Sequence, residues 1–277
     1  MKLIVDSGST KTFWCMVQNK QVVQEIYTAG INPYTTSSER IQEIIKNELL
    51  TDLLQIPSEI YYYGAGCSTE SNKQLIQKEL LLINSLAQIQ VEHDLLAVAR
   101  GLCLHDSGIA VILGTGSNSC LYDGTSIIQQ TPSLGYVLGD EASGVYLGKA
   151  IISDVWYGLM PEELRTDFFI HFPDDLSYYL TKTYKEPSAN AFLASFVLWL
   201  SNHKSHTYVQ KLLKSSFDIF IQKHIKPYGV DTSKVIHATG SIAFNFRDEW
   251  KDVILQHGYQ VGTIEQVPMS GLIQYHK

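Results

Sequence analysis

Two widely separated segments of the chain share one pattern, in which an apolar strand, a turn of small residues and a second strand follow one another. The first covers residues 2–17 with DSGSTKT at its bend, and the second covers residues 109–122 with GTGS at its bend. A third short strand follows each of them, at 22–27 and at 126–130. Because this order recurs with little sequence identity, we interpret the chain as two structural half-repeats.

The first half continues as an alternation of helices and strands. After the three strands, the periodicity predicts a helix at 38–50, a strand at 60–63, a helix at 72–84, a strand at 88–91 and a helix at 94–104. The resulting order, βββαβαβα, predicts an α/β domain. Since the second pattern begins just after residue 106, we expect two lobes, at 1–106 and 107–277.

The second half repeats the three strands and then inserts several helices. The pattern predicts a helix at 141–156, a helical insertion at about 159–230, a strand at 235–238, a helix at 242–257 and a last helix at 271–276. The turn Thr239-Gly240-Ser241 joins that strand to the helix that follows it. We expect the last helix to pack back on the first lobe.

Composition excludes several classes of protein. A net charge of -7 offers no general attraction for a polyphosphate backbone, so we expect no nucleic-acid partner. The longest apolar stretch, 191–200, is about half of the roughly 20 residues that span a bilayer, and Asp6 interrupts the N-terminal apolar run, so neither a membrane segment nor a signal peptide is expected. The four cysteines form no CxxC pair, which favours free thiols and a cytoplasmic protein.

The two glycine turns are candidate anion sites, since their backbone N–H groups and hydroxyls converge without obstruction by side chains. Asp6, at the end of the first strand, offers a carboxylate for Mg²⁺, and Lys11 offers an ammonium for phosphate. Two such turns facing each other would hold a polyphosphate. Neither GxxxxGK[ST] nor GxGxxG occurs, which disfavours a Walker-type NTPase and a Rossmann dinucleotide site.

Several further residues have both a structural and a functional interpretation. Asp94 begins an apolar helix, where it could cap the helix or act as a general base for phosphoryl transfer. Asp140 and Glu141 precede another helix, where they could cap it or bind a ligand. Asn32 is either a turn residue or an amide that binds sugar hydroxyls. Both interpretations remain open for each.

Four motifs together resemble the superfamily of actin, Hsp70 and sugar kinases. They are DSGSTKT, GIAVILGTGSNS, HATGSIAFNF and LGYVLGDEASG. Within this superfamily the chain is most similar to the group that combines N-acetylglucosamine kinase with the BadF/BadG/BcrA/BcrD-type ATPases. The resemblance implies two RNase H-like (actin-like ATPase) lobes, each with a mixed five-stranded sheet, and a helical insertion in the second.

The same resemblance implies ATP-dependent phosphorylation of N-acetylglucosamine or a related amino sugar at its 6-hydroxyl. Asp94 would be the general base, and Asp6 would hold Mg²⁺. The residues implied for ATP are Gly8, Ser9, Thr10, Lys11, Thr115, Gly116, Gly240 and Ser241. Those implied for the amino sugar are Asn32, Ser117, Asn118, Gly135 and Asp140.

Some features keep other functions open. Ser7 and Ala142 stand where the family tends to have glycine. An ATPase that activates a partner enzyme would need paired cysteines to hold an Fe–S cluster, and a non-catalytic nucleotide-dependent binding module would need no general base. A homodimer is compatible with each of these functions.

Overall fold

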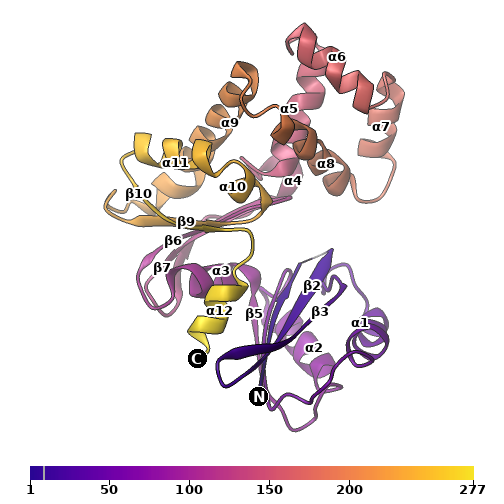
Figure 1. Cartoon of the computed structure of the whole chain (residues 1–277), viewed down its shortest axis with the longest axis vertical. Helices are drawn as coiled ribbons and strands as arrows, with labels where there is room; N and C mark the ends of the chain where they lie inside the picture. The colour runs from indigo at the N-terminus through magenta and orange to yellow at the C-terminus, as the bar shows by residue number, and fades with distance from the viewer. Residues whose placement is uncertain (9) are drawn as a thin grey trace. The chain divides into compact units, whose positions relative to one another are not determined.

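A computed structural model describes residues 1–8 and 10–277 of the chain. They form two compact units, coloured by residue number in Figure 1. The first unit comprises Met1–Asp106, Gly124–Ser126 and Pro268–Lys277, and the second comprises Ser107–Asp123 and Ile127–Val267. No helix in the described ranges is both long enough and apolar enough to cross a membrane.

The first unit contains a mixed five-stranded sheet in the order β3-β2-β1-β4-β5. Its strands are β1 (Lys2–Ser7), β2 (Lys11–Gln18), β3 (Gln21–Ala29), β4 (Glu59–Gly64) and β5 (Gln88–His93). The strands β1, β2 and β3 form an antiparallel meander, whereas β1, β4 and β5 are parallel. Ser7 pairs with Gly64, and Gly64 with His93, so the carboxyl ends of the three parallel strands are level with one another.

Helices cover both faces of this sheet. They are α1 (Ser38–Ile44) with a π-helical turn η1 (Ile45–Leu49), α2 (Glu70–Leu80), α3 (Asp94–Cys103) and α12 (Met269–Tyr275). The core between the sheet and the first two helices contains Leu3, Trp14, Ile41 and Ile76. On the other side α12 packs against α3, as Figure 1 shows, so closely that a Cβ on Gly271 would collide with the backbone of Gly101.

The second unit has the same sheet topology as the first. Its strands are β6 (Gly108–Leu113), β7 (Ser117–Tyr122), β8 (Ile127–Gln130), β9 (Val235–Thr239) and β10 (Gln260–Glu265), in the order β10-β9-β6-β7-β8. Again the first three strands are antiparallel neighbours, and β6, β9 and β10 are parallel. The expected two-lobe fold with a mixed five-stranded sheet in each half is therefore confirmed. The sequence analysis did not predict a strand at the position of β10, residues 260–265.

The helices of the second unit include the expected insertion. They are α4 (Gly135–Leu138), α5 (Gly144–Trp156), α6 (Glu162–His171), α7 (Leu176–Tyr184), α8 (Ala189–Asn202), α9 (Thr207–Phe220), the π-helical turn η2 (Ile221–Ile225), the 3₁₀ turn η3 (Lys226–Tyr228), α10 (Ser241–Asn245) and α11 (Arg247–Gln256). The prediction of one helix at 242–257 is wrong. Phe246, with φ -111°, separates two helices, and its ring is fully buried.

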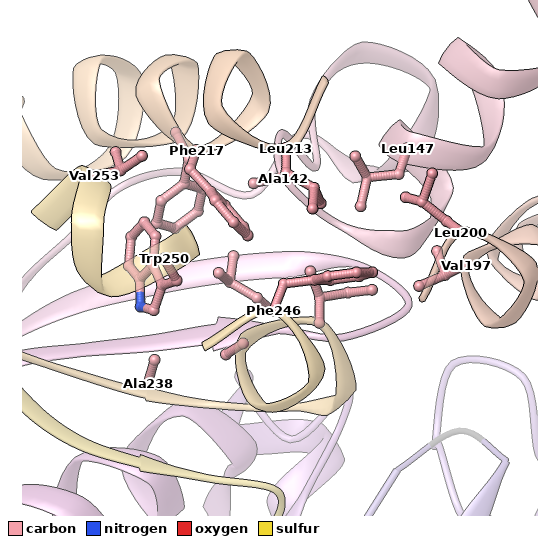
Figure 2. Close-up of a cluster of buried hydrophobic side chains, with 14 of the residues drawn as sticks. Ala142, Leu147, Val197, Leu200, Leu213, Phe217, Ala238, Phe246, Trp250 and Val253 are labelled. Carbon is pink, nitrogen blue, oxygen red and sulfur yellow. The ribbon is translucent and has the colours of Figure 1, made fainter. Parts of the chain in front are cut away.

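The insertion shares one core with the second sheet. Figure 2 shows Trp250 and Phe217, from α11 and α9, above Ala238 of β9. Val197 and Leu200 of α8 belong to the same buried cluster. The inserted helices are thus an integral part of the second unit rather than a separate domain.

Candidate active site

Two carboxylates lie at the carboxyl edge of the first sheet. Asp6 is near the end of β1, and Asp94, which directly follows β5, is the first residue of α3. The strands β1 and β5 are separated by β4, which places the two backbones roughly 10 Å apart at a strand spacing of about 4.8 Å. This edge is where open sheets with parallel strands bind their ligands.

Burial raises the cost of ionising both carboxylates, and the charge of Asp94 adds to it at Asp6. Burial, together with the charge of Asp94, raises the pKa of Asp6 to about 7. Burial also raises the pKa of Asp94, although His93 and the N–H of Leu95, 2.8 Å from Asp94 Oδ1, act in the opposite direction. No lysine or arginine among the described residues contributes to either pKa. A bound cation would therefore favour the ionised form of both carboxylates at this edge.

The carboxylates at this edge fit Mg²⁺, which keeps water and phosphate among its ligands. They do not fit a cation whose ligands all come from the protein. In the described part of the chain, no group of three or more His, Cys, Asp or Glu side chains is arranged to hold a metal. Magnesium commonly takes one or two carboxylates and completes its shell with water and substrate phosphate. The single carboxylate of Asp6 is therefore enough to supply the protein ligand.

The first glycine turn is closed by its own backbone. The N–H of Gly8 donates to the carbonyl of Lys11 over 2.9 Å. Ser7 is fully buried and donates from Oγ to the carbonyl of Ile31 at 3.1 Å. Its hydroxyl is thus bonded within the unit. Thr10 is exposed, and Ser9, implied for ATP, lies outside the described residues.

Lys11 does not point freely into solvent. Its Nζ lies 3.7 Å from the centroid of the Tyr27 ring, which in turn stacks on Phe13 at 4.5 Å. This cation–π contact holds the ammonium over an aromatic surface. To bind phosphate, Lys11 would have to exchange this contact for one with the ligand.

The loop after β4 brings Asn32 to the same edge. Gly66 has φ +80°, and a Cβ on it would collide with Asn32 Oδ1. The N–H of Ala65 donates to the carbonyl of Ser7 over 2.8 Å, and Asn72 Nδ2 donates to the carbonyl of Gly66 over 2.8 Å. Because β4 lies between β1 and β5, this loop lies between the two carboxylates. The role of Gly66 was not predicted, since a lone glycine gives no signal of its partner.

The second glycine turn, in the second unit, has its carbonyls fixed by a helix. The carbonyls of Gly114 and Thr115 accept the N–H groups of Gly144 and Val145, at 2.8 and 3.1 Å, at the start of α5. In a trans peptide the N–H lies opposite the carbonyl, so the N–H groups of Thr115 and Gly116 point away from α5. The turn therefore presents two donors on its other side.

Gly240 packs directly on this turn. It has φ +106°, and a Cβ there would collide with the carbonyl of Leu113. Only glycine accommodates both the conformation and the approach. Ser241, implied for ATP with Gly240, is exposed at the first position of α10.

Asp140 also belongs to this cluster. Its Oδ2 lies 2.9 Å from where a Cβ on Gly116 would stand, and the backbone of Ser117 donates to its carboxylate. Burial raises the pKa of Asp140. The capping interpretation of Asp140 and Glu141 is wrong, because Ser143 caps α5 by accepting from the N–H of Tyr146 at 3.1 Å.

Two other residues implied for the sugar have different surroundings. Asn118 Oδ1 accepts the N–H of Ser119 at 2.9 Å and Gln130 Nε2 at 3.4 Å. Gly135, with φ +70°, begins α4. Within the described residues, these contacts do not join either of them directly to Asp140.

The chain closely resembles one solved structure over its whole length. It is 37% identical to a proposed N-acetylglucosamine kinase from Porphyromonas gingivalis, covers 98% of that chain and gives a TM-score of 0.95. A proposed N-acetylglucosamine kinase from Chromobacterium violaceum is 18% identical, with 98% of that chain covered and a TM-score of 0.76.

A more distant likeness extends to a ROK-family glucokinase. The enzyme from Streptomyces griseus, in complex with glucose and AMPPNP, is 12% identical with a TM-score of 0.63 and 97% of that chain covered. At such low identity this match and the one at 18% show a common fold alone. Comparison with protein-family models gives no match, and neither does comparison with curated protein sequences.

Proposed function

Because the chain belongs to the family that unites N-acetylglucosamine kinases with BadF/BadG/BcrA/BcrD-type ATPases, we propose that it transfers the γ-phosphoryl group of ATP to an amino sugar. The acceptor is the 6-hydroxyl of N-acetylglucosamine or a closely related sugar. The products are ADP and the sugar 6-phosphate.

The observation that carries this proposal is the pair of partly buried carboxylates Asp6 and Asp94. Asp94 accepts the proton of the sugar 6-hydroxyl as its oxygen attacks the γ-phosphorus, and the bond from phosphorus to the β,γ-bridging oxygen breaks. A raised pKa makes Asp94 a stronger base than a solvated carboxylate. Asp6 holds Mg²⁺, which neutralises charge on the phosphates when bound.

The nucleotide is bound mainly by backbone groups. In the second unit, the N–H groups of Thr115 and Gly116 face away from α5 and serve as donors to phosphate oxygens. Gly240, whose close packing on the carbonyl of Leu113 holds the start of α10 against this turn, lies on the adenosine side of the proposed site. In the first unit, the hydroxyl of Thr10 and the ammonium of Lys11 supply the remaining phosphate contacts, and Gly8, whose N–H is bonded to the carbonyl of Lys11, leaves room for the phosphates beside the turn.

The amino sugar is bound by amide, hydroxyl and carboxylate groups. Asp140 accepts hydrogen bonds from sugar hydroxyls, and Asn32, held at the carboxyl edge by Gly66, bonds to others. Ser117, Asn118 and Gly135 complete the proposed set. Buried groups of this kind select strongly for a ligand that satisfies them, since a ligand lacking the hydroxyl leaves them unpaired.

The cysteines disfavour an activator that carries an Fe–S cluster. Cys15, Cys67, Cys103 and Cys120 are all buried. Burial raises the pKa of Cys67 and of Cys103 to about 12, so neither is readily deprotonated to the thiolate that an iron ligand requires.

The test is ADP release by the purified protein with Mg-ATP and a panel of sugars. We expect release that depends on N-acetylglucosamine or a related amino sugar, with the 6-phosphate as product. The matched control is 6-deoxy-N-acetylglucosamine, which lacks the accepting hydroxyl and should give no turnover. Equal ADP release with and without every sugar would refute the kinase proposal.

A further inference from the structure

The 131–141 segment of the second unit carries two residues of the proposed sugar site, Gly135 and Asp140. Its conformation is unfavourable in isolation. Asp140 has φ +56°, and Ala142, just beyond the segment, has φ +61°. Left-handed conformations of residues other than glycine cost of the order of 1 kcal/mol or more and persist where neighbouring contacts enforce them. Hydrogen bonds at both ends of the segment supply such contacts.

The first end of the segment is bound to the turns that follow α9. Thr131 donates from Oγ1 to the carbonyl of His224 at 2.8 Å. The N–H of Thr131 donates to the hydroxyl of Tyr228 at 3.2 Å, and that hydroxyl lies 2.6 Å from Ser119 Oγ of β7. The start of the segment is thus fixed to η2, η3 and the sheet.

The other end is bound to the same residue, His224, through its side chain. Nε2 of His224 donates to Glu141 Oε2 at 2.9 Å, and Lys223 Nζ donates to Glu141 Oε1 at 2.6 Å. The side chains of Glu141 and His224 are only 7% and 6% exposed. Although burial opposes ionisation, these two hydrogen bonds lower the pKa of Glu141 to about 2, so the carboxylate is charged at neutral pH.

The π-helical turn η2 makes this double contact feasible. Such turns insert one residue into a helix and are frequent at functional sites. In η2 the imidazole of His224 faces Glu141, while the backbone carbonyl of His224 accepts the hydrogen bond from Thr131 Oγ1. The Phe220 ring stacks on the imidazole at 4.5 Å and fixes its plane.

We propose that His224 is a positioning residue for the sugar, because it fastens both ends of the 131–141 segment and so sets the position of Gly135 and Asp140. This inference rests on the proposed function. His224 itself does not touch the sugar. The end of the helical insertion thereby controls affinity for the amino sugar, while the groups proposed for ATP lie outside the segment.

The test combines amide hydrogen exchange with steady-state kinetics on the full-length protein. His224→Ala removes the bond to Glu141, and Thr131→Val removes the hydroxyl bond at the other end. We expect exchange in residues 131–141 to become about tenfold faster in each. We also expect the KM for N-acetylglucosamine to rise about tenfold or more, with the KM for ATP changed less than about twofold.

Two controls make the result specific. His257→Ala breaks another His–carboxylate pair of the second unit, less buried than the first, in which His257 Nε2 lies 3.0 Å from Asp218 Oδ1, and should change neither quantity. His224→Gln keeps an N–H donor and should restore much of the sugar affinity. Thr131→Val leaves the buried pair intact, so it tests the proposal even where His224→Ala fails to fold.

The outcomes separate this inference from the function on which it rests. Unchanged exchange in 131–141, or faster exchange with an unchanged sugar KM, would overturn the positioning role. An equal rise in both KM values would do so too, since it would indicate general damage. Absence of sugar turnover in the wild-type protein would instead refute the proposed function, and exchange alone would then decide whether His224 fastens the segment.

Discussion

Replacing Asp6 by asparagine should stabilise the protein at neutral pH while removing its activity. The carboxylate has a pKa of about 7 in the folded chain, against an ordinary value of 3.8. Asparagine has nearly the same shape as the protonated acid and does not ionise. The Asp6→Asn protein therefore avoids the cost of a charged group at a partly buried position beside Asp94.

The magnitude follows from the linkage of proton binding to folding. A pKa of about 7 in place of 3.8 corresponds to about 4 kcal/mol of lost stability once both states are ionised. Between pH 4 and pH 7 the unfolded chain has released this proton and the folded chain retains it, so stability falls as the pH rises. Above pH 7 the loss is constant. About 3 kcal/mol of it develops between pH 5 and pH 8.

The assay is urea unfolding of wild type and Asp6→Asn at several pH values from 5 to 8. When the free energies of unfolding of the two proteins are subtracted, the contributions of the titrating groups that they share cancel. We expect the variant to gain about 3 kcal/mol relative to wild type across this range. The control is Asp52→Asn, which replaces an exposed carboxylate of the same unit and should change the free energy of unfolding by less than about 0.5 kcal/mol.

A change of less than about 1 kcal/mol between pH 5 and pH 8 would refute the reasoning, because it would mean that Asp6 ionises freely in the folded protein. A variant that is less stable than wild type at pH 8 would refute it as well. If Asp6→Asn is more stable than wild type but has lost turnover, the charged carboxylate of Asp6 is required for activity although it destabilises the folded protein.

Three further predictions concern the same site. Asp94→Asn should lower kcat by about 10² to 10⁴ while ATP affinity by calorimetry stays unchanged, and an unchanged kcat would exclude the general base. In wild type, kcat/KM should rise with pH through about 7, as Asp6 ionises, and a flat profile between pH 6 and pH 8 would contradict this. Gly240→Ala should lose about 1–3 kcal/mol of stability and most ATP binding, because its Cβ would meet the carbonyl of Leu113. The control Gly229→Ala, also at positive φ (+63°) but in open space, should lose less stability and no ATP binding.

Local patterns were enough to predict the framework of both units. The two hairpins follow from short apolar strands around turns of Gly, Ser and Thr, and the proximity of Asp6 and Asp94 follows from parallel strands ending at one edge. The strand β10 was missed because its sequence, QVGTIE, has a glycine at its centre and partly exposed side chains, so it lacks a clear alternation.

Contacts between distant residues could not be predicted. Glu141 and His224 are 83 residues apart, and nothing near either of them indicates the other. The break at Phe246 is similar, since a continuous helical pattern runs through it and the burial of one ring in the second core decides the local conformation. In each case packing across the fold overrides the local preference.

The packing of α12 on α3 has a consequence for synthesis of the chain. Residues 268–277 belong to the first unit, yet they emerge from the ribosome after the whole of the second. Until then α3 lacks the neighbour that covers Gly101, so the first unit remains incomplete while the second is already free to fold. The N-terminal unit, translated first, is thus the one completed last, and a nascent chain released early would expose an apolar helix to aggregation.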